Sequence, residues 1–536
     1  MVIEVRLLPM GDRAVLAEVG SLAEVLALHA ALQAALPLIE RTGTHAAGGV
    51  SRAWSSARPV ELVPAARTVL VAFDPGRMPV SAVRGWIAEI AGQAAVGDAP
   101  TEADEVEVPV VYDGPDLADT AALLGIDVGS LVARHRAAEW TVAFTGFAPG
   151  FGYLVSDDWP YDVPRLESPR TRVPVGAVGL AGGFTGAYPR ETPGGWRLIA
   201  TTDAVLLDPD AAQPALLTPG ARVRFRESVA SGRATARAAR TGDPTTADSA
   251  FTVVEPGLLA TVQDLGRPGA ASLGVSHSGA LDRAALRAAN RLVGNDEDAA
   301  VIEVTMGGFR AIADRDLWFA VTGAWGPITV DDEPIDPYDA HVWPRGRELH
   351  LDWFAHGARA YLAVRGGVGG AAILDSRSTD VLSGLGPARL AAGTRIAPAG
   401  AAAREVPPSV IAPWGAPHDD ELEIELAPGP RADWFTPDAQ RTLYESVWTV
   451  TNDADRIGMR LDGPELARAR TDELPSEGMV PGALQVPPSG RPTVLLADGP
   501  VTGGYPVIAV VAEGSLDLLA QARPGTRVRL RHARPA

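Results

Sequence analysis

Apolar and polar positions follow two different periods in the first hundred residues. Ser21 and Glu24 have the spacing of a capping box, and apolar side chains then recur three and four positions apart, which predicts a helix. Short runs rich in Val and Ala predict strands on either side of it. The strands and helices predicted here lie at residues 13–19, 21 to about 36, 68–73 and 80 to about 94. Residues 1–97 are therefore expected to form a small α/β module.

The pattern changes near residue 105. From there the chain consists of short apolar runs separated by Gly and Pro, which is typical of a barrel or sandwich and not of a parallel sheet. Three helices interrupt it, predicted at residues 115–125, 128–137 and 280–293. The domains that we predict are 98–226, a linker at 227–250 without apolar periodicity, and 251–536, which an Ala- and Pro-rich stretch divides into lobes of about 251–390 and 421–536.

A short motif occurs once in each half of the chain. Thr185-Gly-Ala-Tyr188-Pro189 returns as Thr502-Gly-Gly-Tyr505-Pro506, and a Val-Pro pair precedes each copy, at residues 173–174 and 486–487. Similar strand-rich patterns surround both copies. The repetition favours two related barrels, one in each half.

Length and charge narrow the class of protein. The 536 residues exceed what one core holds, so several domains are expected. The chain has no apolar run near the length of a membrane span, and its first ten residues do not resemble a signal peptide. We therefore expect a cytoplasmic protein without membrane contact. A net charge of −19 makes nucleic acid an unfavourable partner.

Two residue types are missing from the composition. The chain has no Cys, and all 47 of its Lys and Arg residues are Arg. It therefore has no thiolate nucleophile, no P-loop lysine, no amine for a Schiff base with PLP and no lysine for covalent biotin. Phosphate or carboxylate groups would have to be held by Arg, by backbone N–H groups or by a metal.

The densest motif lies at residues 145–154 (TGFAPGFGYL). Its Gly and Pro residues allow sharp turns, while its aromatic rings can line a pocket, so we predict ligand contacts there from Gly146, Phe147, Pro149, Gly150, Phe151 and Tyr153. His135 precedes it on a helical face with Leu131 and Val132. That histidine is either a structural residue of a packed helix or a catalytic one.

The order of motifs resembles a known family, the two small subunits of bacterial 5-oxoprolinase. In the first half the motifs resemble the smaller, KipI-like of the two, at residues 11–12, 73–75, 145–154, 163–165, 168–170, 173–176 and 192–196. In the second half they resemble the larger, KipA-like one, at residues 255–269, 274–282, 290, 294–295, 362–367, 376–379, 455–461, 476–478, 485–487 and 503–506. The chain is thus identified as a fusion of 5-oxoprolinase subunits B and C, which are also called allophanate hydrolase subunits 1 and 2.

The resemblance implies a fold and an activity. The expected fold is mainly β with an α/β module, and has cyclophilin-like barrels in both halves that are related by pseudosymmetry. The expected activity is the ATP-dependent opening of the lactam 5-oxoproline to glutamate, with ATP and Mg²⁺ and a separate LamB/YcsF-type protein as the third 5-oxoprolinase subunit. The hydrolase that gives allophanate hydrolase its name uses a Ser-Ser-Lys triad, which a chain without lysine cannot contain.

Candidate site residues come from these motifs. Arg forks and glycine backbones would hold phosphate or the carboxylate of a small amide or lactam acid, and carboxylates would serve as acid, base or Mg²⁺ ligands. Asp282 has a second interpretation as a helix cap. The predicted catalytic residues are Glu477, His135 and Asp498; the metal ligands are Asp264 and Asp282; and the further binding residues are Gly194, Gly195, Trp196, Arg377, Arg456, Gln485 and Tyr505.

Two other functions remain open at this stage. The same pair of domains occurs in urea carboxylase, so the chain could be a carboxyltransferase component that works with biotin carboxylase and carrier proteins. It could also be a non-catalytic regulator that binds a sensor kinase. The sequence does not decide whether the chain forms a homo-oligomer. We expect the site at an interface between domains, where pockets are commonly found.

Overall fold

The N-terminal module forms as the sequence predicts. Its sheet has the order β1-β2-β4-β3, and two helices cover one face of it. Ser21 and Glu24 exchange the two hydrogen bonds of a capping box at the start of the first helix. The elements are β1 (Arg6–Pro9), β2 (Ala14–Glu18), α1 (Leu22–Gly43), β3 (Val60–Pro64), β4 (Thr68–Phe73) and α2 (Val80–Gln93).

The computed structural model describes most of the chain. The described residues are 3–43, 60–96, 105–209, 211, 213–228, 249–401, 403–408, 415–418 and 420–533. Most of the predicted linker lies outside them. Within them, no helix is long and apolar enough to cross a membrane.

The first barrel follows the module along the chain. Its seven strands close through a bridge between Val111 and Thr201, and a small two-stranded sheet, β8–β11, lies outside them. The elements are β5 (Glu105–Val110), α3 (Leu117–Leu123), α4 (Val128–Ala137), β6 (Trp140–Thr145), β7 (Gly152–Val155), β8 (Arg170–Val173), β9 (Ala177–Ala181), β10 (Phe184–Ala187), β11 (Thr192–Gly194), β12 (Arg197–Thr201) and β13 (Arg222–Glu227).

A two-sheet sandwich begins the second half. One sheet has the order β20-β19-β22-β17-β14-β24 and the other β15-β16-β23-β18-β21, with apolar side chains filling the space between them. The elements are β14 (Phe251–Pro256), β15 (Leu259–Gln263), the 3₁₀ helix η2 (Ala271–Leu273), α5 (Arg283–Leu292), β16 (Val301–Thr305), β17 (Phe309–Ala313), β18 (Leu317–Trp325), β19 (Ile328–Val330), β20 (Glu333–Pro334), β21 (His341–Trp343), β22 (Glu348–Leu351), β23 (His356–Val364) and β24 (Arg395–Ile396).

The second barrel ends the chain. It is closed in the order β25-β32-β29-β30-β27-β26-β33, with the small sheet β28–β31 beside it. The elements are β25 (Glu421–Pro428), η3 (Ala432–Trp434), α6 (Pro437–Glu445), β26 (Val447–Ala454), β27 (Gly458–Asp462), β28 (Glu477–Gly478), β29 (Ala483–Gln485), β30 (Thr493–Leu495), β31 (Thr502–Gly503), β32 (Val507–Val511), α7 (Glu513–Ala520) and β33 (Arg527–His532).

The two barrels have the same topology. Followed through their hydrogen bonds, the strands run β5-β13-β6-β7-β10-β9-β12 in the first and β25-β33-β26-β27-β30-β29-β32 in the second. In each barrel the strands that come first and last in the sequence, β5 with β13 and β25 with β33, pair in parallel, and all other pairs are antiparallel. The small sheets β8–β11 and β28–β31 also correspond. The predicted pair of barrels, one in each half, is confirmed.

The repeated Thr-Gly-x-Tyr-Pro motif that predicted this relation does not occupy equivalent positions in the two barrels. Thr185 lies in β10, whereas Thr502 lies in β31, the counterpart of β11. The true correspondences are Trp140-Thr-Val with Trp448-Thr-Val, and Pro219-Gly-Ala-Arg-Val-Arg with Pro524-Gly-Thr-Arg-Val-Arg. Both tryptophan indoles donate to a carbonyl five residues earlier. In each barrel the two segments also pair with each other, with Thr141 opposite Arg222 and Thr449 opposite Arg527.

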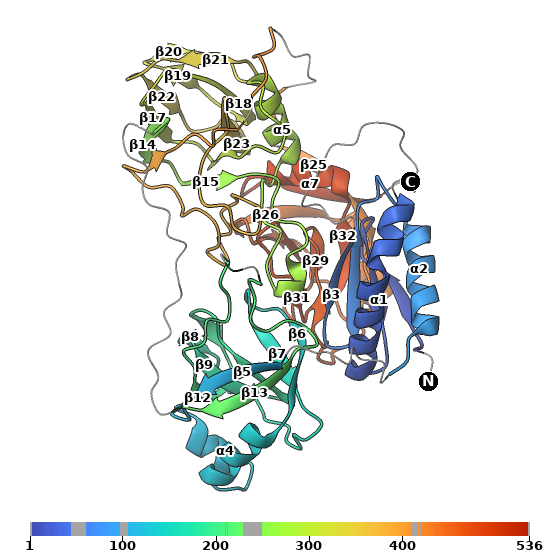
Figure 1. The fold of residues 1–536 in the computed structure, drawn as a ribbon. Helices are drawn as coiled ribbons and strands as arrows, with labels where there is room; N and C mark the ends of the chain where they lie inside the picture. The colour runs from blue at the N-terminus through green and yellow to red at the C-terminus, as the bar shows by residue number, and fades with distance from the viewer. Residues whose placement is uncertain are drawn as a thin grey trace.

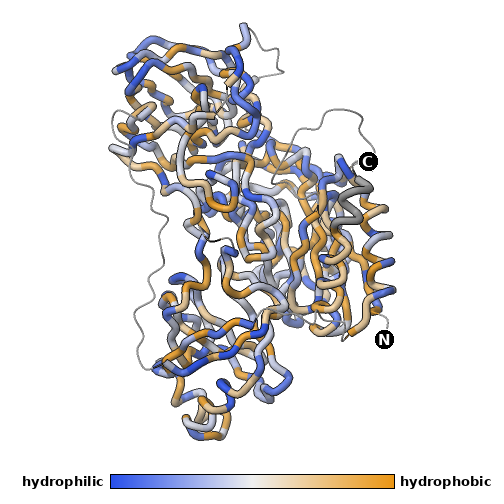
Figure 2. Tube along the Cα trace, in the orientation of Figure 1, coloured by the Kyte–Doolittle hydropathy of each residue, from blue (hydrophilic) through white to orange (hydrophobic). Residues whose placement is uncertain are grey.

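The N-terminal module packs its sheet on the second barrel, and its strand β3 also approaches β6 of the first barrel (Figure 1). Leu16 and Leu70 of the module lie in one apolar cluster with Met479, Val480 and Val510 of the barrel. The sheet of the module is therefore covered on both faces, by its helices on one side and by this barrel on the other. Figure 2 shows apolar positions along the strands on both sides of this contact. The contact joins the beginning and the end of the chain.

Candidate functional site

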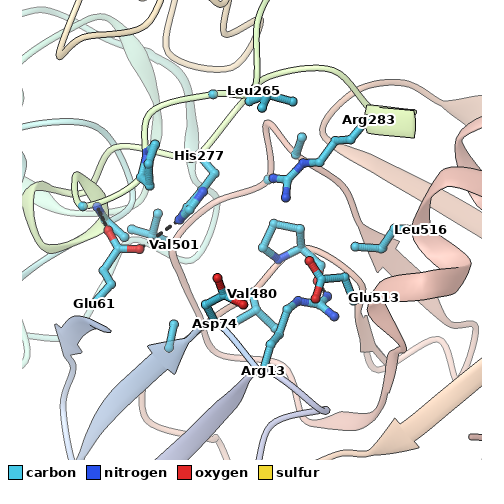
Figure 3. Close-up of a pocket in the computed structure, with 18 of the residues that line it drawn as sticks. Arg13, Glu61, Asp74, Leu265, His277, Arg283, Val480, Val501, Glu513 and Leu516 are labelled. Atoms are coloured by element: carbon cyan, nitrogen blue, oxygen red, sulfur yellow. Dashed lines mark hydrogen bonds and ion pairs between the residues drawn. The ribbon is translucent and has the colours of Figure 1, made fainter. Parts of the chain in front are cut away.

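A cavity of about 530 Å³ lies where three parts of the chain meet. Strands β3 and β4 of the module form one wall, the segment 264–277 before α5 forms another, and the second barrel closes the third (Figure 3). We call it the His277 cavity. Pockets of this size at domain junctions are common binding sites for small ligands.

A histidine and a glutamate form a hydrogen-bonded pair on one side of this cavity (Figure 3). The Nε2 atom of His277 lies 2.9 Å from Oε2 of Glu61, and the other oxygen of Glu61 accepts from the backbone N–H of Ala271 at 2.7 Å. Burial opposes ionisation of Glu61, but His277 and the backbone donors outweigh it and lower the pKa of the carboxyl. When the ring is neutral, an ionised Glu61 places its proton on Nε2 and leaves the lone pair on Nδ1.

Arginines lie on the opposite side of the same cavity. Arg13 projects from the module and donates to the carbonyl oxygens of Val511 and Pro481 in the second barrel. Its position is therefore fixed by contacts with both parts of the chain. Arg283, at the start of α5, points into the cavity near Glu513 (Figure 3). Burial lowers the pKa of both guanidinium groups, with Glu513 acting in the opposite direction. The cavity thus combines a possible base with cations that can hold a carboxylate.

Glycines shape the loop that carries His277. Gly266 and Gly279 have φ values of +91° and +89°, and a Cβ on Gly266 would lie 2.6 Å from the carbonyl oxygen of His277. The backbone N–H of Arg267 donates to that same oxygen. Side chains other than hydrogen fit neither position, so the two ends of the loop approach closely and fix the histidine in place.

Glu477 lies in a second cavity, between the edge of the module and the second barrel. This cavity has about 580 Å³, and we call it the Glu477 cavity. Arg431 donates to Oε1 of Glu477 and to Glu18 of the module, so the carboxylate is held by an ion pair. Burial raises the pKa of Glu477, although Arg431 opposes the shift. Glu477 and His277 thus line different cavities.

The Arg431–Glu477 pair has a counterpart in the first barrel. There Asp116 pairs with Arg170, which lies opposite Gly194 in the small sheet as Glu477 lies opposite Gly503. The charges are reversed. Each pair joins the small sheet to the segment that follows the first strand of its barrel. The position of Glu477 therefore has a structural role in both barrels.

Arg456 and Asp498 lie in a buried network and not in a cavity. The guanidinium of Arg456 donates to both oxygens of Asp498, at 2.9 and 3.0 Å, and to Glu303 of the sandwich at 2.5 Å. All three side chains are at most 1% exposed. The network joins the second barrel to the sandwich.

Both predicted metal ligands, Asp264 and Asp282, accept hydrogen bonds from the protein. Oδ1 of Asp264 accepts from Gly266, Ser376 and Ser378, and its Oδ2 accepts from the backbone of Arg377. Among the described residues, no group of three or more His, Asp or Glu side chains could hold a metal. Asp264 therefore orders the surrounding loops through its hydrogen bonds, and its role as a metal ligand stays a prediction.

Asp282 caps α5, which is the second of its two interpretations. Its Oδ1 accepts from the backbone N–H of Ala285 and its Oδ2 from Gln521 of the second barrel. Burial, with the neighbouring Asp517 adding to it, raises the pKa of Asp282 to about 7. The carboxyl therefore joins the sandwich to the second barrel at a point where its charge is unfavourable.

This shift predicts a pH dependence of stability. The folded chain keeps the proton on Asp282 up to about pH 7, whereas the unfolded chain loses it near 3.8, so this group's contribution falls as pH rises between these values. Between pH 5 and pH 8 it should fall by about 3 kcal/mol. Chemical unfolding of wild type and of Asp282→Ser, which keeps a cap without a charge, measures the difference. Parallel pH profiles for the two proteins would contradict the assignment.

His135 lies in the core of the first barrel. It is fully buried, stacks on Phe225 and has hydrogen bonds at both ring nitrogens, to Tyr112 and Thr185. Burial lowers its pKa to about 3. The surroundings of His135 are those of a structural residue in a packed core, and its ring lines neither cavity.

The aromatic motif of the first barrel forms a packed cluster. Phe151 contacts Tyr153, Tyr188 and Trp196, while Phe147, at φ +66°, is the exposed member. The remaining predicted residues of this region (Gly146, Pro149, Gly150, Gly194 and Gly195) lie in the turns around this cluster and in β11. None of these residues lines either cavity.

The turn at Gly146 fastens the first barrel to the second half. A Cβ on Gly146 would overlap Oγ1 of Thr502, and the N–H of Gly150 donates to the carbonyl oxygen of Leu273. The glycine is needed for this close approach. Gln485 and Tyr505 both belong to the second half. Gln485 is buried at the end of β29, and Tyr505 is exposed. Neither residue lines the His277 cavity or the Glu477 cavity.

The pair that the structure brings together was not singled out from the sequence. His277 lies inside a motif of the second half, between Gly274 and Ser278, and was the only titratable side chain of that motif apart from Asp282. Glu61 lies in a plain strand pattern and carries no local signal. Only the packing of the module on the second half places them 2.9 Å apart.

Comparisons with known proteins agree with this division of the chain. Residues 5–217 match the family model of carboxyltransferase domain, subdomain C and D, and residues 273–532 match that of subdomain A and B. The 5-oxoprolinase C subunit of Escherichia coli K12 is 38% identical over 278 residues, which cover 50% of this chain and 86% of that protein. The 5-oxoprolinase B subunit of Escherichia coli O157:H7 is 48% identical over 123 residues, or 22% of this chain and 56% of that protein.

Two further similarities extend the picture. The crystal structure of TTHA0988 superposes with a TM-score of 0.82 at 34% identity, covering 97% of this chain and 99% of that one. The urea amidolyase of Lachancea kluyveri is 32% identical over 308 residues, but these cover only 17% of that protein. The whole arrangement of module, barrels and sandwich is therefore shared with a solved protein.

Proposed function

The chain belongs to the carboxyltransferase-domain family as a fusion of counterparts of 5-oxoprolinase subunits B and C, and on this ground we propose that it is a component of an ATP-dependent 5-oxoprolinase. We place the reaction in the His277 cavity. The observation that carries this proposal is the His277–Glu61 pair facing Arg13 and Arg283. Glu61 comes from the half that resembles the smaller protein and His277 from the half that resembles the larger one, so the site needs both.

The residues of the cavity suit a lactam acid. Arg13 and Arg283 would hold the carboxylate of the substrate, because guanidinium groups bind carboxylates with directed hydrogen bonds. Nδ1 of His277 would accept a proton from the attacking water, while Glu61 keeps the other nitrogen protonated and stabilises the ring when it becomes charged. Burial of the site strengthens these interactions relative to water.

ATP supplies the activation that the resonance-stabilised lactam carbonyl requires. Among the described residues, the cavity offers arginines for phosphate oxygens, including Arg77 and Arg287 near its rim, but no cluster of carboxylates for Mg²⁺. The donor set of this chain therefore does not fit a resident metal, and no step here uses one. A metal would arrive with the nucleotide or be held by another protein of the complex.

The activity should depend on a partner. We expect the full chain, mixed with a LamB/YcsF-type protein, to release phosphate from ATP only when 5-oxoproline is present. Phosphate release and glutamate formation are both measured, across a range of ratios of the two proteins. Absence of coupling at every ratio would rule out this function for the chain.

A carboxyltransferase role is the second candidate, supported by the match to urea amidolyase. It predicts turnover that depends on urea together with biotin carboxylase and a biotinylated carrier, because this chain has no lysine to carry biotin. The same preparation, tested with these partners, separates the two functions. A regulatory role toward a sensor kinase stays a prediction that no comparison tests.

A further inference from the structure

Helix α7 of the second barrel presents one face to the His277 cavity. Glu513, Leu516 and Asp517 are three and four positions apart, so they lie on the same side of this helix. Glu513 and Leu516 line the cavity, and Oδ1 of Asp517 accepts the backbone N–H of Arg283 at 2.8 Å. This face of α7 therefore meets the start of α5, where Arg283 enters the cavity.

Hydrogen bonds on two sides fix the place of Glu513. Asp12 of the module accepts the backbone N–H of Glu513 at its Oδ2 and a hydrogen bond from Arg13 at its Oδ1, both at 3.0 Å. Asp517, one turn along α7, accepts from the backbone of Arg283. Glu513 is thus held beside Arg13 by the module and beside Arg283 by the sandwich.

The carboxylate of Glu513 lies with the two arginines, on the side of the cavity away from His277 (Figure 3). Burial lowers the pKa of the guanidinium groups of Arg13 and Arg283, and the charge of Glu513 opposes this shift at both. In the part of the chain that the structure describes, no hydrogen bond or ion pair occupies this carboxylate. It therefore remains available to a ligand.

We propose that Glu513 completes a subsite for an α-amino acid, in which Arg13 and Arg283 hold the carboxylate and Glu513 holds the amino group. The two groups of such a ligand share one carbon atom, so a carboxylate bound by the arginines brings its amino group to the neighbouring anion. An ammonium group only donates hydrogen bonds, which a carboxylate accepts and a guanidinium cannot. The ligand class is an open-chain α-amino acid and not any small acid.

This subsite rests on the proposed function, which assigns the carboxylate of the substrate to the same two arginines. Opening of 5-oxoproline leaves an amino group on the carbon atom that bears this carboxylate. Glu513 then accepts a hydrogen bond from the ring N–H before opening and from the ammonium group after it. Hydrogen bonds between two charged groups are the stronger ones, so Glu513 favours the opened form.

L-Glutamate and glutarate test the subsite on the full chain. The two molecules share a carbon skeleton with a carboxylate at each end and differ in the amino group. Titration calorimetry without ATP or a partner protein should show at least about tenfold tighter binding of glutamate, because glutarate leaves Glu513 unpaired and brings a further net negative charge.

Two variants locate the amino group and the carboxylate. Glu513→Gln keeps the shape and removes the charge, so the preference for glutamate over glutarate should fall about tenfold. Arg283→Met should weaken both probes by a similar factor, because both need the carboxylate contact. The control is Glu139→Gln, which alters an exposed ion pair with Arg224 on the first barrel and should bind both probes like wild type. Thermal unfolding shows that each variant is folded.

The proposal fails on any of three results. Equal binding of the two probes to wild type, or binding of neither, would show that the cavity does not recognise an amino group. An unchanged preference in Glu513→Gln would assign the amino group to another residue, and unchanged binding in Arg283→Met would place the ligand outside this cavity. None of these measurements uses turnover, so the subsite can fail while 5-oxoproline-dependent phosphate release succeeds, and the reverse.

Discussion

Replacement of His277 by Ala is expected to lower 5-oxoproline-dependent turnover by at least about 100-fold, the usual effect of losing a general base. Glu61 lies 2.9 Å from Nε2 of the ring and orients it. Without the ring, the cavity loses Nδ1, the proposed acceptor for the proton of the attacking water. Binding of the acid should persist, because Arg13 and Arg283 are untouched, so kcat should fall more than KM rises.

Glu61→Gln tests the same pair from the other half of the chain. An amide at this position keeps the shape but cannot stabilise a charged ring, so turnover should fall in the same direction and the double variant should be no worse than His277→Ala. The matched control is Glu423→Gln, which alters an exposed ion pair with Arg531 on the second barrel. If His277→Ala keeps most of its turnover, the reaction does not use this cavity.

Replacement of Arg456 by Met should lower the free energy of unfolding by about 3–5 kcal/mol. The change removes the guanidinium that pairs with both Glu303 and Asp498. Glu303 then keeps Arg359 only at 4.0 Å, and Asp498 keeps the backbone N–H of Val381. The substitution also removes a hydrogen bond to the carbonyl oxygen of Gly279, next to the loop of His277. The second barrel and the sandwich should therefore separate more easily.

Urea unfolding followed by Trp fluorescence measures this loss. Arg460→Met is the matched control, because Arg460 pairs with Asp453 at the surface and its loss should cost less than about 1 kcal/mol. Equal effects of the two substitutions would show that the buried network contributes no more than a surface ion pair. A loss of turnover in Arg456→Met would follow from stability and would not make Arg456 a ligand-binding residue.

The fold could be predicted from the sequence to a large extent. Local periodicity gave α4 at its observed bounds, residues Val128–Ala137, and α2 to within one residue. The relation between the barrels was also predicted, although from the wrong motif. Segments that do correspond, such as Arg222-Val-Arg and Arg527-Val-Arg, lie in the strands that pair in parallel. What the pattern could not give is which barrel the module covers.

That choice of partner is what builds the candidate site. Glu61 and His277 are 216 residues apart, and no spacing rule connects them. The charged residues of the motifs were the natural candidates for a ligand-binding site. Arg456 and Asp498 are instead buried between domains, where they pair with each other. Long-range packing decides which motif residues face a cavity and which hold domains together, and a single sequence does not contain that information in local form.

The most direct test of the proposed site is a crystal structure of the chain with 5-oxoproline bound. We predict density for the lactam acid in the His277 cavity, with its carboxylate at Arg13 and Arg283 and its ring next to His277. Density for the acid at the aromatic cluster of the first barrel, or in the Glu477 cavity with the His277 cavity empty, would contradict the proposal.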